Sequence, residues 1–132
     1  MIHSTNSPND TNQSDFKQIT QLIETYFNGL YNGDTQLLDN LFQDESWLIT
    51  PHGRRSKRQW LKDVANRPSP KELHQDYLFS ILAVDIISDQ AMVKVYCPMF
   101  EFKYVDFLGL VKSDDKWLIA SKMYTDIASQ SS

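Results

Sequence analysis

The chain has 132 residues, the size of a single domain, and 41% of them are apolar, which is enough for a hydrophobic core. Its net charge of −4 argues against a nucleic-acid partner, and only four glycines and five prolines argue against a fibrous or linker-rich chain. No run approaches the roughly 18 apolar residues of a membrane span, and the first residues lack the apolar stretch of a signal peptide. We therefore expect a cytoplasmic protein with no membrane partner.

Residues 1–13 offer almost nothing to bury, and we expect them to form a disordered tail. The domain should span residues 14–127, followed by a C-terminal tail of residues 128–132. A first helix should begin near Ser14 or Asp15, because apolar residues then recur at three- and four-residue steps. These residues are Phe16, Ile19, Ile23, Tyr26, Phe27 and Leu30.

Two further helices are marked by capping residues. Asp34 should cap a helix whose apolar side includes Leu37, Leu38, Leu41 and Phe42. Ser56, with Gln59 three residues later, forms a capping-box pattern that begins a third helix. A short strand is expected between the two helices, over residues 46–50.

The rest of the chain is typical of strands. We expect them at residues 73–87, 91–98, 102–112 and 116–125, and both faces of these segments are apolar. All three helices precede this sheet and can cover only one face. The face that carries Val105, Phe107 and Val111 therefore lacks cover within the chain, and we expect it to form a homodimer interface.

The single cysteine, Cys97, cannot form an internal disulfide. Its neighbours Val93, Val95 and Met99 are apolar, which favours a buried thiol that packs as a small apolar side chain over a nucleophile.

Short motifs follow one another in the order typical of one superfamily. They are Tyr26-Phe27-x-Gly29-Leu30-Tyr31-x-Gly33-Asp34, Leu41-Phe42, Pro51-x-Gly53 and Lys116-Trp117-x-Ile119. With helices preceding long strands, the chain resembles the nuclear transport factor 2-like superfamily, also called SnoaL-like or cystatin-like. Within it the chain is most similar to the putative lumazine-binding group. That likeness rests on Arg67-Pro68-Ser69-Pro70, Asp106-Phe107-Leu108 and Trp117-Leu118-Ile119-Ala120-x-Lys122.

The resemblance implies an α+β cone, in which three N-terminal helices pack in the concave face of a curved mixed or antiparallel sheet. Ligands of such relatives sit in a cavity at the open end. The superfamily includes isomerases, dehydratases, cyclases and transport factors, so the fold alone assigns no function.

Isomerase-like members place a tyrosine on the first helix and an aspartate in a late strand, and the two donate hydrogen bonds to a substrate oxyanion. Those positions correspond to Tyr26 and Asp106 here. The aspartate that moves the proton corresponds to Thr50, whose hydroxyl is no base at neutral pH, so the isomerase reaction is not implied. His74 is the nearest replacement base, which makes Tyr26, Asp106 and His74 the candidate catalytic residues.

Asp106 shares a strand face with Phe102 and Tyr104, so its carboxyl must be paired, hydrated or protonated. A structural hydrogen bond to a tyrosine or to backbone explains it as well as a ligand-binding acid does. Together with Tyr26, Trp47 and Trp60, the residues Phe102, Tyr104 and Asp106 are the candidate ligand contacts. The two tryptophans fit the core equally well.

His74 and Asp76 lie two residues apart and would share a strand face as an acid–base pair, although a surface position suits His74 as well. With three histidines and one cysteine in the chain, we expect no metal and no cofactor. The run Gly53-Arg54-Arg55-Ser56-Lys57-Arg58 stands where a helix dipole disfavours cations, which calls for acidic neighbours or a bound anion unless the run is simply solvated.

Two functions remain open at this point. The first is a pocket for a small aromatic or carbonyl-bearing molecule, with or without weak isomerase- or dehydratase-type chemistry. The second is a non-catalytic dimeric interaction module with a vestigial cavity.

Overall fold

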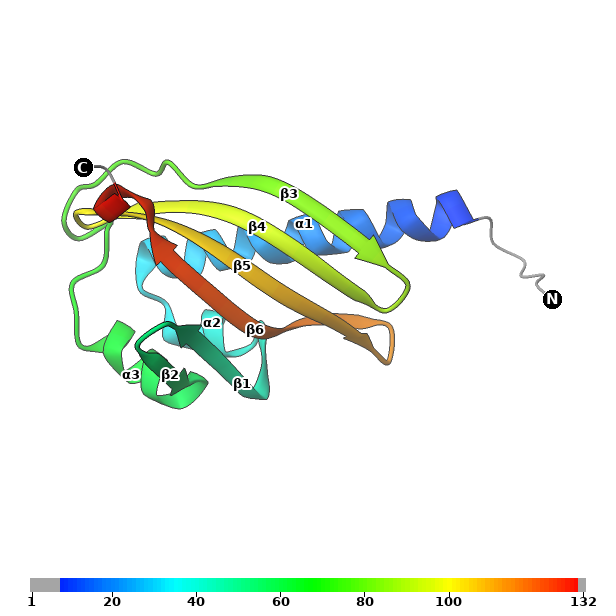
Figure 1. The fold of residues 1–132 in the computed structure, drawn as a ribbon, viewed down its shortest axis with the longest axis horizontal. Coiled ribbons are helices and arrows are strands. Elements are labelled where there is room, and N and C mark those ends of the chain that lie inside the picture. Colours follow the sequence, from blue (N-terminus) through cyan, green and yellow to red (C-terminus); the bar gives the residue numbers. More distant parts are fainter. Residues whose placement is uncertain (1–7, 131–132) are drawn as a thin grey trace.

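A computed structural model describes residues 8–130 of the chain (Figure 1). The helices are α1 (Pro8–Asn32), α2 (Thr35–Asp39), α3 (Lys57–Ala65) and the short 3-10 helix η1 (Ile127–Gln130). The strands are β1 (Phe42–Thr50), β2 (Gly53–Ser56), β3 (Ser80–Ile87), β4 (Gln90–Met99), β5 (Phe102–Ser113) and β6 (Lys116–Asp126). Among the described residues, no helix is both long and apolar enough to cross a membrane.

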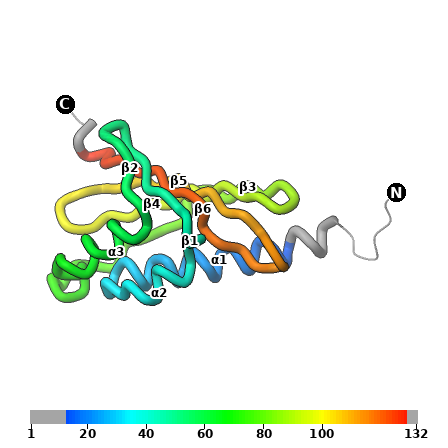
Figure 2. Tube along the Cα trace, turned by 90° about the horizontal axis from the view of Figure 1, so that it is seen from below, coloured from blue at the N-terminus to red at the C-terminus, as the bar shows by residue number. Residues whose placement is uncertain are grey.

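The six strands form one sheet in the order β2-β1-β6-β5-β4-β3. β1 runs parallel to β6, and every other neighbouring pair is antiparallel, so the sheet is mixed. The three helices lie on one side of this curled sheet (Figure 2). This arrangement confirms the predicted α+β class, with N-terminal helices in the concave face of a curved sheet that does not close.

Capping residues end and begin the helices where the sequence indicates. The Asp34 carboxylate accepts a hydrogen bond from the Leu37 amide, and the Ser56 hydroxyl accepts one from the Gln59 amide. Each bond satisfies an amide that has no partner within its helix. Gly33 follows α1 with a φ of 66°, the left-handed conformation that glycine adopts at least cost.

The boundaries of α1 differ from the prediction at its start. The helix begins at Pro8 rather than at Ser14 or Asp15, because a proline fits the first helical position, where no amide is needed. Asp15 is not a cap. Its buried carboxylate accepts hydrogen bonds from the Lys112 ammonium (3.0 Å) and the Trp117 indole (3.1 Å), which anchor α1 to the β5–β6 hairpin. Residues 1–7 of the predicted tail lie outside the described residues.

The second helix is shorter than predicted, the strand predicted over residues 46–50 begins earlier, and one strand was not predicted. Phe42 does not belong to the second helix but begins β1, since α2 ends at Asp39. The segment at residues 53–56 pairs with β1 as strand β2, which the run of charged residues concealed. At the other end of the chain, η1 occupies the start of the predicted C-terminal tail, and residues 131–132 lie outside the described residues.

The strand predicted over residues 73–87 begins only at Ser80. Before it, Ser69 and Glu72 exchange two side-chain to backbone hydrogen bonds of 3.1 Å each, a capping box that closes a single turn. His74 ends this turn with a φ of 58°. A left-handed residue cannot continue a strand, so His74 and Asp76 do not share a strand face.

The core lies between α1, α2, α3 and the inner face of the sheet. It contains Ile19, Ile23, Tyr26, Phe27, Leu30, Leu38, Phe42, Leu48, Trp60, Val64, Val93, Val95, Cys97, Leu108, Leu110, Trp117 and Ile119. On the outer face, Phe107 is 39% exposed, so within the described residues this face is uncovered, as expected.

Candidate functional site

A buried hydrogen bond joins the first helix to the middle of the sheet. The Tyr26 hydroxyl on α1 donates to Oδ2 of Asp106 on β5 at 2.7 Å. Tyr26 is 0% exposed and Asp106 is 1% exposed. The Cys97 thiol on β4 lies 3.5 Å from the same carboxylate oxygen. The two residues singled out in the sequence are thus direct partners inside the cone.

Lys122 on β6 completes this cluster. Its Nζ lies 3.8 Å from Oδ2 of Asp106, and the residue is only 4% exposed. The ammonium also stands over three aromatic rings, at 4.5 Å from the centroid of Trp60, 5.3 Å from Tyr26 and 5.4 Å from Tyr124. Ring faces attract cations, so the aromatic residues and Asp106 together compensate for the hydration that Lys122 loses. We call Tyr26, Cys97, Asp106 and Lys122 the polar core.

Burial dominates the electrostatics of the polar core. It lowers the pKa of Lys122, while the Asp106 carboxylate acts in the opposite direction. Burial also raises the pKa of Tyr26, and the negative charge of Asp106 adds to that rise. Burial and the negative charge of Asp106 also raise the pKa of Cys97. The side chain is therefore a thiol rather than a reactive thiolate.

A bulge in β6 explains why Lys122 points inward. Trp117 and Ile119 are buried, and strict alternation would next place Ser121 inside and Lys122 outside. The register with β5 instead jumps from Leu110 opposite Ile119 to Gly109 opposite Ser121, so one extra residue is inserted into β6. Sequence reasoning missed Lys122 as a site residue, although it ends one of the motifs that carry the family resemblance.

An aromatic column leads from the surface to the polar core along the inner face of β5. Phe102 is exposed, Tyr104 is partly buried and Asp106 is buried. The rings of Phe102 and Tyr104 lie 5.2 Å apart, and those of Tyr104 and Tyr124 lie 5.7 Å apart, edge to face. Tyr124 stands directly opposite Asp106 on β6, so these rings separate the carboxylate from solvent.

Arg55 and Asp63 close the side of this column. Arg55 donates a 2.7 Å hydrogen bond to the Tyr124 hydroxyl and forms an ion pair with Asp63 on α3. The basic run at residues 53–58 was expected to need acidic neighbours or a bound anion, and Arg55 has such an acidic neighbour in Asp63.

Two candidates from the sequence lie apart from the polar core. His74 is exposed and lines a surface hollow of about 470 Å³ with Phe102, a hollow to which neither Tyr26 nor Asp106 contributes. Thr50 is the last residue of β1, and its hydroxyl accepts a hydrogen bond from the His52 amide in the β1–β2 turn at 3.2 Å. Neither residue is placed to exchange a proton with a group bound at Asp106.

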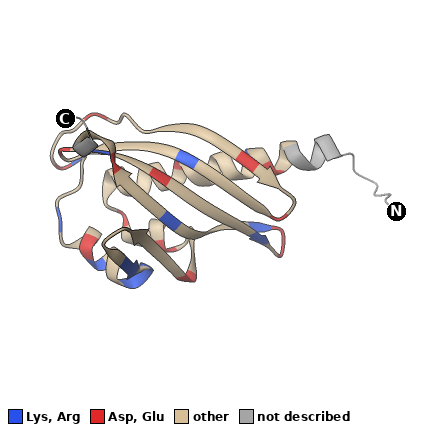
Figure 3. Cartoon of the chain, viewed as in Figure 1, with Lys and Arg blue, Asp and Glu red and all other residues tan. Residues whose placement is uncertain are grey.

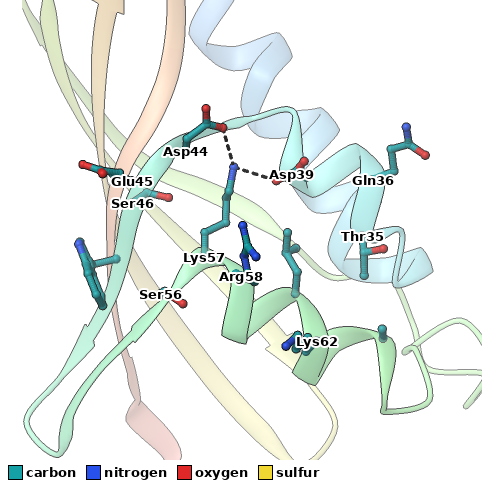
Figure 4. A pocket seen from close by; sticks show the side chains of 13 residues that line it. Thr35, Gln36, Asp39, Asp44, Glu45, Ser46, Ser56, Lys57, Arg58 and Lys62 are labelled. Atoms are coloured by element: carbon teal, nitrogen blue, oxygen red, sulfur yellow. Dashed lines mark hydrogen bonds and ion pairs between the residues drawn. The ribbon is translucent and has the colours of Figure 1, made fainter.

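The two tryptophans have different surroundings. Trp60 is buried beneath the Lys122 ammonium and is part of the wall of the polar core. Trp47 is 42% exposed and points away from the cone, with the Arg54 guanidinium 4.9 Å from its ring centroid. It contributes to a separate hollow of about 1090 Å³ between α2, α3, β1 and β2 (Figure 4).

Lys57 lines this second hollow and forms ion pairs with two carboxylates there. Its ammonium lies 2.8 Å from the Asp39 carboxylate and 3.4 Å from that of Asp44, as the dashed lines in Figure 4 show. The first residue of α3 is therefore a cation held by acidic neighbours, which offsets the unfavourable helix dipole. The arrangement is that of a structural ion pair. Among residues 8–130, no three potential ligands gather that could hold a metal ion.

The polar core combines one acceptor with two donors. Asp106 is an acceptor flanked by two donors, the Tyr26 hydroxyl and the Lys122 ammonium. A group that presents a donor beside an acceptor complements this set, and the surrounding aromatic rings suit a flat molecule.

Solved structures share this fold along nearly their whole length. A protein of unknown function from Silicibacter pomeroyi, described as NTF-2 like, is 21% identical, with 87% of this chain and 98% of that chain covered and a TM-score of 0.71. One from Shewanella baltica is 19% identical, with 85% and 93% covered and a TM-score of 0.72. A protein described as a putative dehydratase of the NTF2-like family, from Streptomyces avermitilis, is 14% identical, with 86% and 97% covered and a TM-score of 0.64.

At these identities the likeness shows the fold. Among proteins with curated descriptions, none matches this chain. The family model described as "Putative lumazine-binding" matches residues 14–125, which contain both Tyr26 and Asp106 as well as Lys122. The chain therefore belongs to this putative lumazine-binding family and has an NTF2-like fold.

Proposed function

We propose that this protein binds a small, flat, carbonyl-bearing heterocycle of the lumazine type inside the cone. The observation that carries this proposal is the fully buried cluster of Tyr26, Asp106 and Lys122, in which a carboxylate is flanked by two donors within an aromatic shell. A buried charged pair contributes little to stability compared with apolar side chains of similar size. Its presence deep in an apolar core therefore calls for a reason other than stability, and we propose that this reason is a ligand.

The chemistry of a lumazine ring complements this cluster. Its pyrimidinedione edge carries an N–H group between two carbonyl groups. The N–H would donate to Asp106, while one carbonyl would accept from Lys122 and the other from Tyr26. The ring plane would then be enclosed by Trp60 and Tyr124, whose faces already surround the Lys122 ammonium. Aromatic stacking adds to such hydrogen bonds without requiring a particular substituent.

Entry requires movement of the aromatic column, because Tyr26 and Asp106 are 0% and 1% exposed. Tyr104 and Tyr124 are partly buried, and we propose that these two side chains move aside to admit the ligand. We propose binding rather than fast turnover, since Thr50 and His74 supply no base beside Asp106. Weak proton-transfer chemistry would have to use the buried groups themselves.

A second candidate function is a non-catalytic interaction module in which the polar core is purely structural. The near-complete burial of the cluster favours it. The two candidates differ in one respect: only the first predicts saturable binding of a ligand that depends on the Tyr26 hydroxyl.

Titration of lumazine into the protein, followed by the fluorescence of the ring and of the three tryptophans, tests the proposal. We expect saturable binding that weakens about tenfold in Tyr26→Phe, since one hydrogen bond to a buried polar group is worth about 1–2 kcal/mol. Asp106→Asn should weaken binding further, measured at a temperature at which that variant is folded.

Tyr96→Phe on the neighbouring strand β4 is the matched control, because it removes a hydroxyl outside the polar core. Lumazine that does not bind saturably, or that binds Tyr26→Phe and the parent protein equally, would leave the structural module as the better explanation.

We also propose a homodimer, formed through the outer face of the sheet. Exposed apolar side chains lie on neighbouring strands there, and we call this set the outer patch: Trp47, Ile49, Met92, Phe107 and Met123. Ile49, Met123 and Phe107 stand directly opposite one another across β1, β6 and β5. Figure 3 shows charged positions along the strands as well as at their ends, and Lys94 on β4 stands directly opposite Phe107, beside the outer patch.

The shape of this face suits a second copy of the chain. A shallow hollow of about 380 Å³, lined by Met92, Gly109 and Ser121, lies next to the protruding Phe107 ring along β5. In a two-fold interface the same patch meets itself, so the ring of each copy would enter the hollow of the other.

A further inference from the structure

Arg67, the first residue of the Arg-Pro-Ser-Pro motif, has no anionic partner among the described residues. Its side chain is partly buried and lies with its guanidinium 4.9 Å from the centroid of the Phe100 ring. Within residues 8–130 the Arg67 guanidinium makes neither a hydrogen bond nor an ion pair, although the Asp63 carboxylate acts on it at longer range. A guanidinium has five N–H donors in a planar fork that matches a carboxylate or a phosphate, so a partly buried guanidinium without such a partner is suited to bind an oxyanion.

Hydrogen bonds hold the segment that carries the Phe100 ring against which Arg67 lies. The Gln75 side chain holds the Phe100 backbone from both sides, since its amide nitrogen donates to the Phe100 carbonyl at 3.0 Å and its amide oxygen accepts from the Phe100 amide at 2.8 Å. The Tyr31 hydroxyl in turn donates to the Gln75 carbonyl at 2.7 Å. Phe100 has a φ of 63°, which costs a residue with a side chain about 1–2 kcal/mol, and these bonds offset it.

This platform lies at the end of the molecule where a ligand would enter. The end of α3, the loop after it, the β4–β5 turn and η1 gather there, opposite the start of α1 (Figures 1 and 2). Burial is the main cause of the lowered pKa of Arg67, and Arg55 adds to it by repulsion. The Arg67 charge also opposes the rise in the pKa of Tyr26, which is raised mainly by burial, so Arg67 stands within electrostatic range of the polar core.

The cations around the site are not equally paired. Arg55 forms an ion pair with Asp63, and Lys122 lies 3.8 Å from Asp106, whereas Arg67 has no ion-pair partner among the described residues and is attracted to Asp63 only at longer range. An anionic ligand would pair with the Arg67 guanidinium, whereas a second cation would be repelled.

We infer that Arg67 binds an oxyanion carried by the ligand, so that the ligand is a flat heterocycle with a carboxylate or phosphate substituent pointing toward the open end of the cone. The inference rests on the proposed function and specifies its ligand class. The ring would occupy the polar core, and the oxyanion would lie against the guanidinium, which stays on the Phe100 ring.

Two pairs of probes separate the sources of the oxyanion. Lumazine is compared with 6-carboxylumazine, which adds a carboxylate, and riboflavin with riboflavin 5′-phosphate, which adds a phosphate. Affinities are measured by ligand fluorescence for the parent protein, for Arg67→Met and for Arg58→Met. Arg58 is the matched control, because it is an exposed arginine on the side of the second hollow.

We expect one anionic probe to bind the parent protein about tenfold more tightly than its neutral counterpart, which corresponds to about 1.4 kcal/mol. Arg67→Met should abolish this preference and leave the affinity of the neutral ring within about twofold, while Arg58→Met keeps the preference. Tighter binding of 6-carboxylumazine than of lumazine indicates a carboxylate ligand. Tighter binding of riboflavin 5′-phosphate than of riboflavin indicates a phosphate ligand.

Saturable lumazine binding with no preference for either anionic probe, or a preference that survives Arg67→Met, would overturn the role of Arg67 and leave the proposed function standing. Absence of binding by all four probes would overturn both.

Discussion

Lys122 and Asp106 face each other inside the cone, with Nζ 3.8 Å from Oδ2 and with 5% and 1% of their side chains exposed. The pair joins β6 to β5 at adjoining register positions, since Asp106 lies opposite Tyr124 and Leu108 lies opposite Lys122. Both charged groups are buried, so each relies on the other for most of its charge compensation, with aromatic rings around Lys122 and the Tyr26 hydroxyl beside Asp106. This dependence makes the pair the most sensitive point of the polar core.

The first prediction concerns this pair. Lys122→Met should lower the free energy of unfolding by about 3 kcal/mol, because removing one partner leaves the other charge buried and uncompensated. Asp106→Leu should cost a similar amount for the same reason. The double variant should lose less than the two single losses combined, since it removes both charges together; the loss that remains comes from the buried Tyr26 hydroxyl, whose acceptor is Asp106. Urea unfolding of all four proteins gives the coupling energy, and additive losses would show that the two groups do not interact.

The second prediction concerns pH. Burial and the nearby Asp106 carboxylate raise the pKa of the Cys97 thiol, so the folded protein keeps a proton that the unfolded chain releases above its ordinary pKa of about 8.5. The unfolded state then binds fewer protons, and the free energy of unfolding falls as pH rises. The contribution of one such group approaches about 1.4 kcal/mol per pH unit.

Cys97→Ala should therefore make the decline in stability between pH 8.5 and 10.5 less steep, even though the variant is less stable at pH 7. Lys122 acts in the opposite direction in both proteins, because burial lowers its pKa and its unfolded form binds the extra proton. The comparison of slopes isolates the thiol. Parallel curves from urea unfolding at each pH would contradict the shift.

The third prediction tests the contact between α1 and α2. A Cβ atom added at Gly29 would lie 2.6 Å from Cδ2 and 2.7 Å from Cγ of the buried Leu38. Gly29→Ala should therefore lower the free energy of unfolding by about 1–2 kcal/mol through overpacking, despite the better helix propensity of alanine. In a Leu38→Ala background the same change should become neutral or stabilising, and thermal unfolding of the four proteins measures both effects.

The fourth prediction concerns the proposed dimer. Phe107→Glu places a charge in the centre of the outer patch and should convert a dimer into a monomer at tens of micromolar, as measured by light scattering. Phe16→Glu is the matched control, because Phe16 is an exposed phenylalanine on α1, away from the outer patch. A monomeric parent protein, or a Phe107→Glu variant that remains dimeric, would rule out this interface.

Local signals in the sequence sufficed for much of this fold. The caps at Asp34 and Ser56 act within three residues of the amides they satisfy, and the apolar period of α1 indicates its buried face except at Phe16, which is 51% exposed. The resemblance to isomerase-like proteins predicted the contact between Tyr26 and Asp106, because this chain has a tyrosine and an aspartate at the two corresponding positions.

The tertiary structure decided what local pattern cannot express. A single inserted residue in β6 turned Lys122 from the outer to the inner face, and no propensity marks where a strand will bulge against its neighbour. A left-handed turn ended by His74 removed that residue from the strand on which it was expected. The Phe100 ring beside Arg67 is held by a hydrogen bond between Gln75 and Phe100, which are 25 residues apart in the chain. These features depend on pairing between distant segments, and the free energy that selects among such pairings belongs to the packed molecule rather than to any window of its sequence.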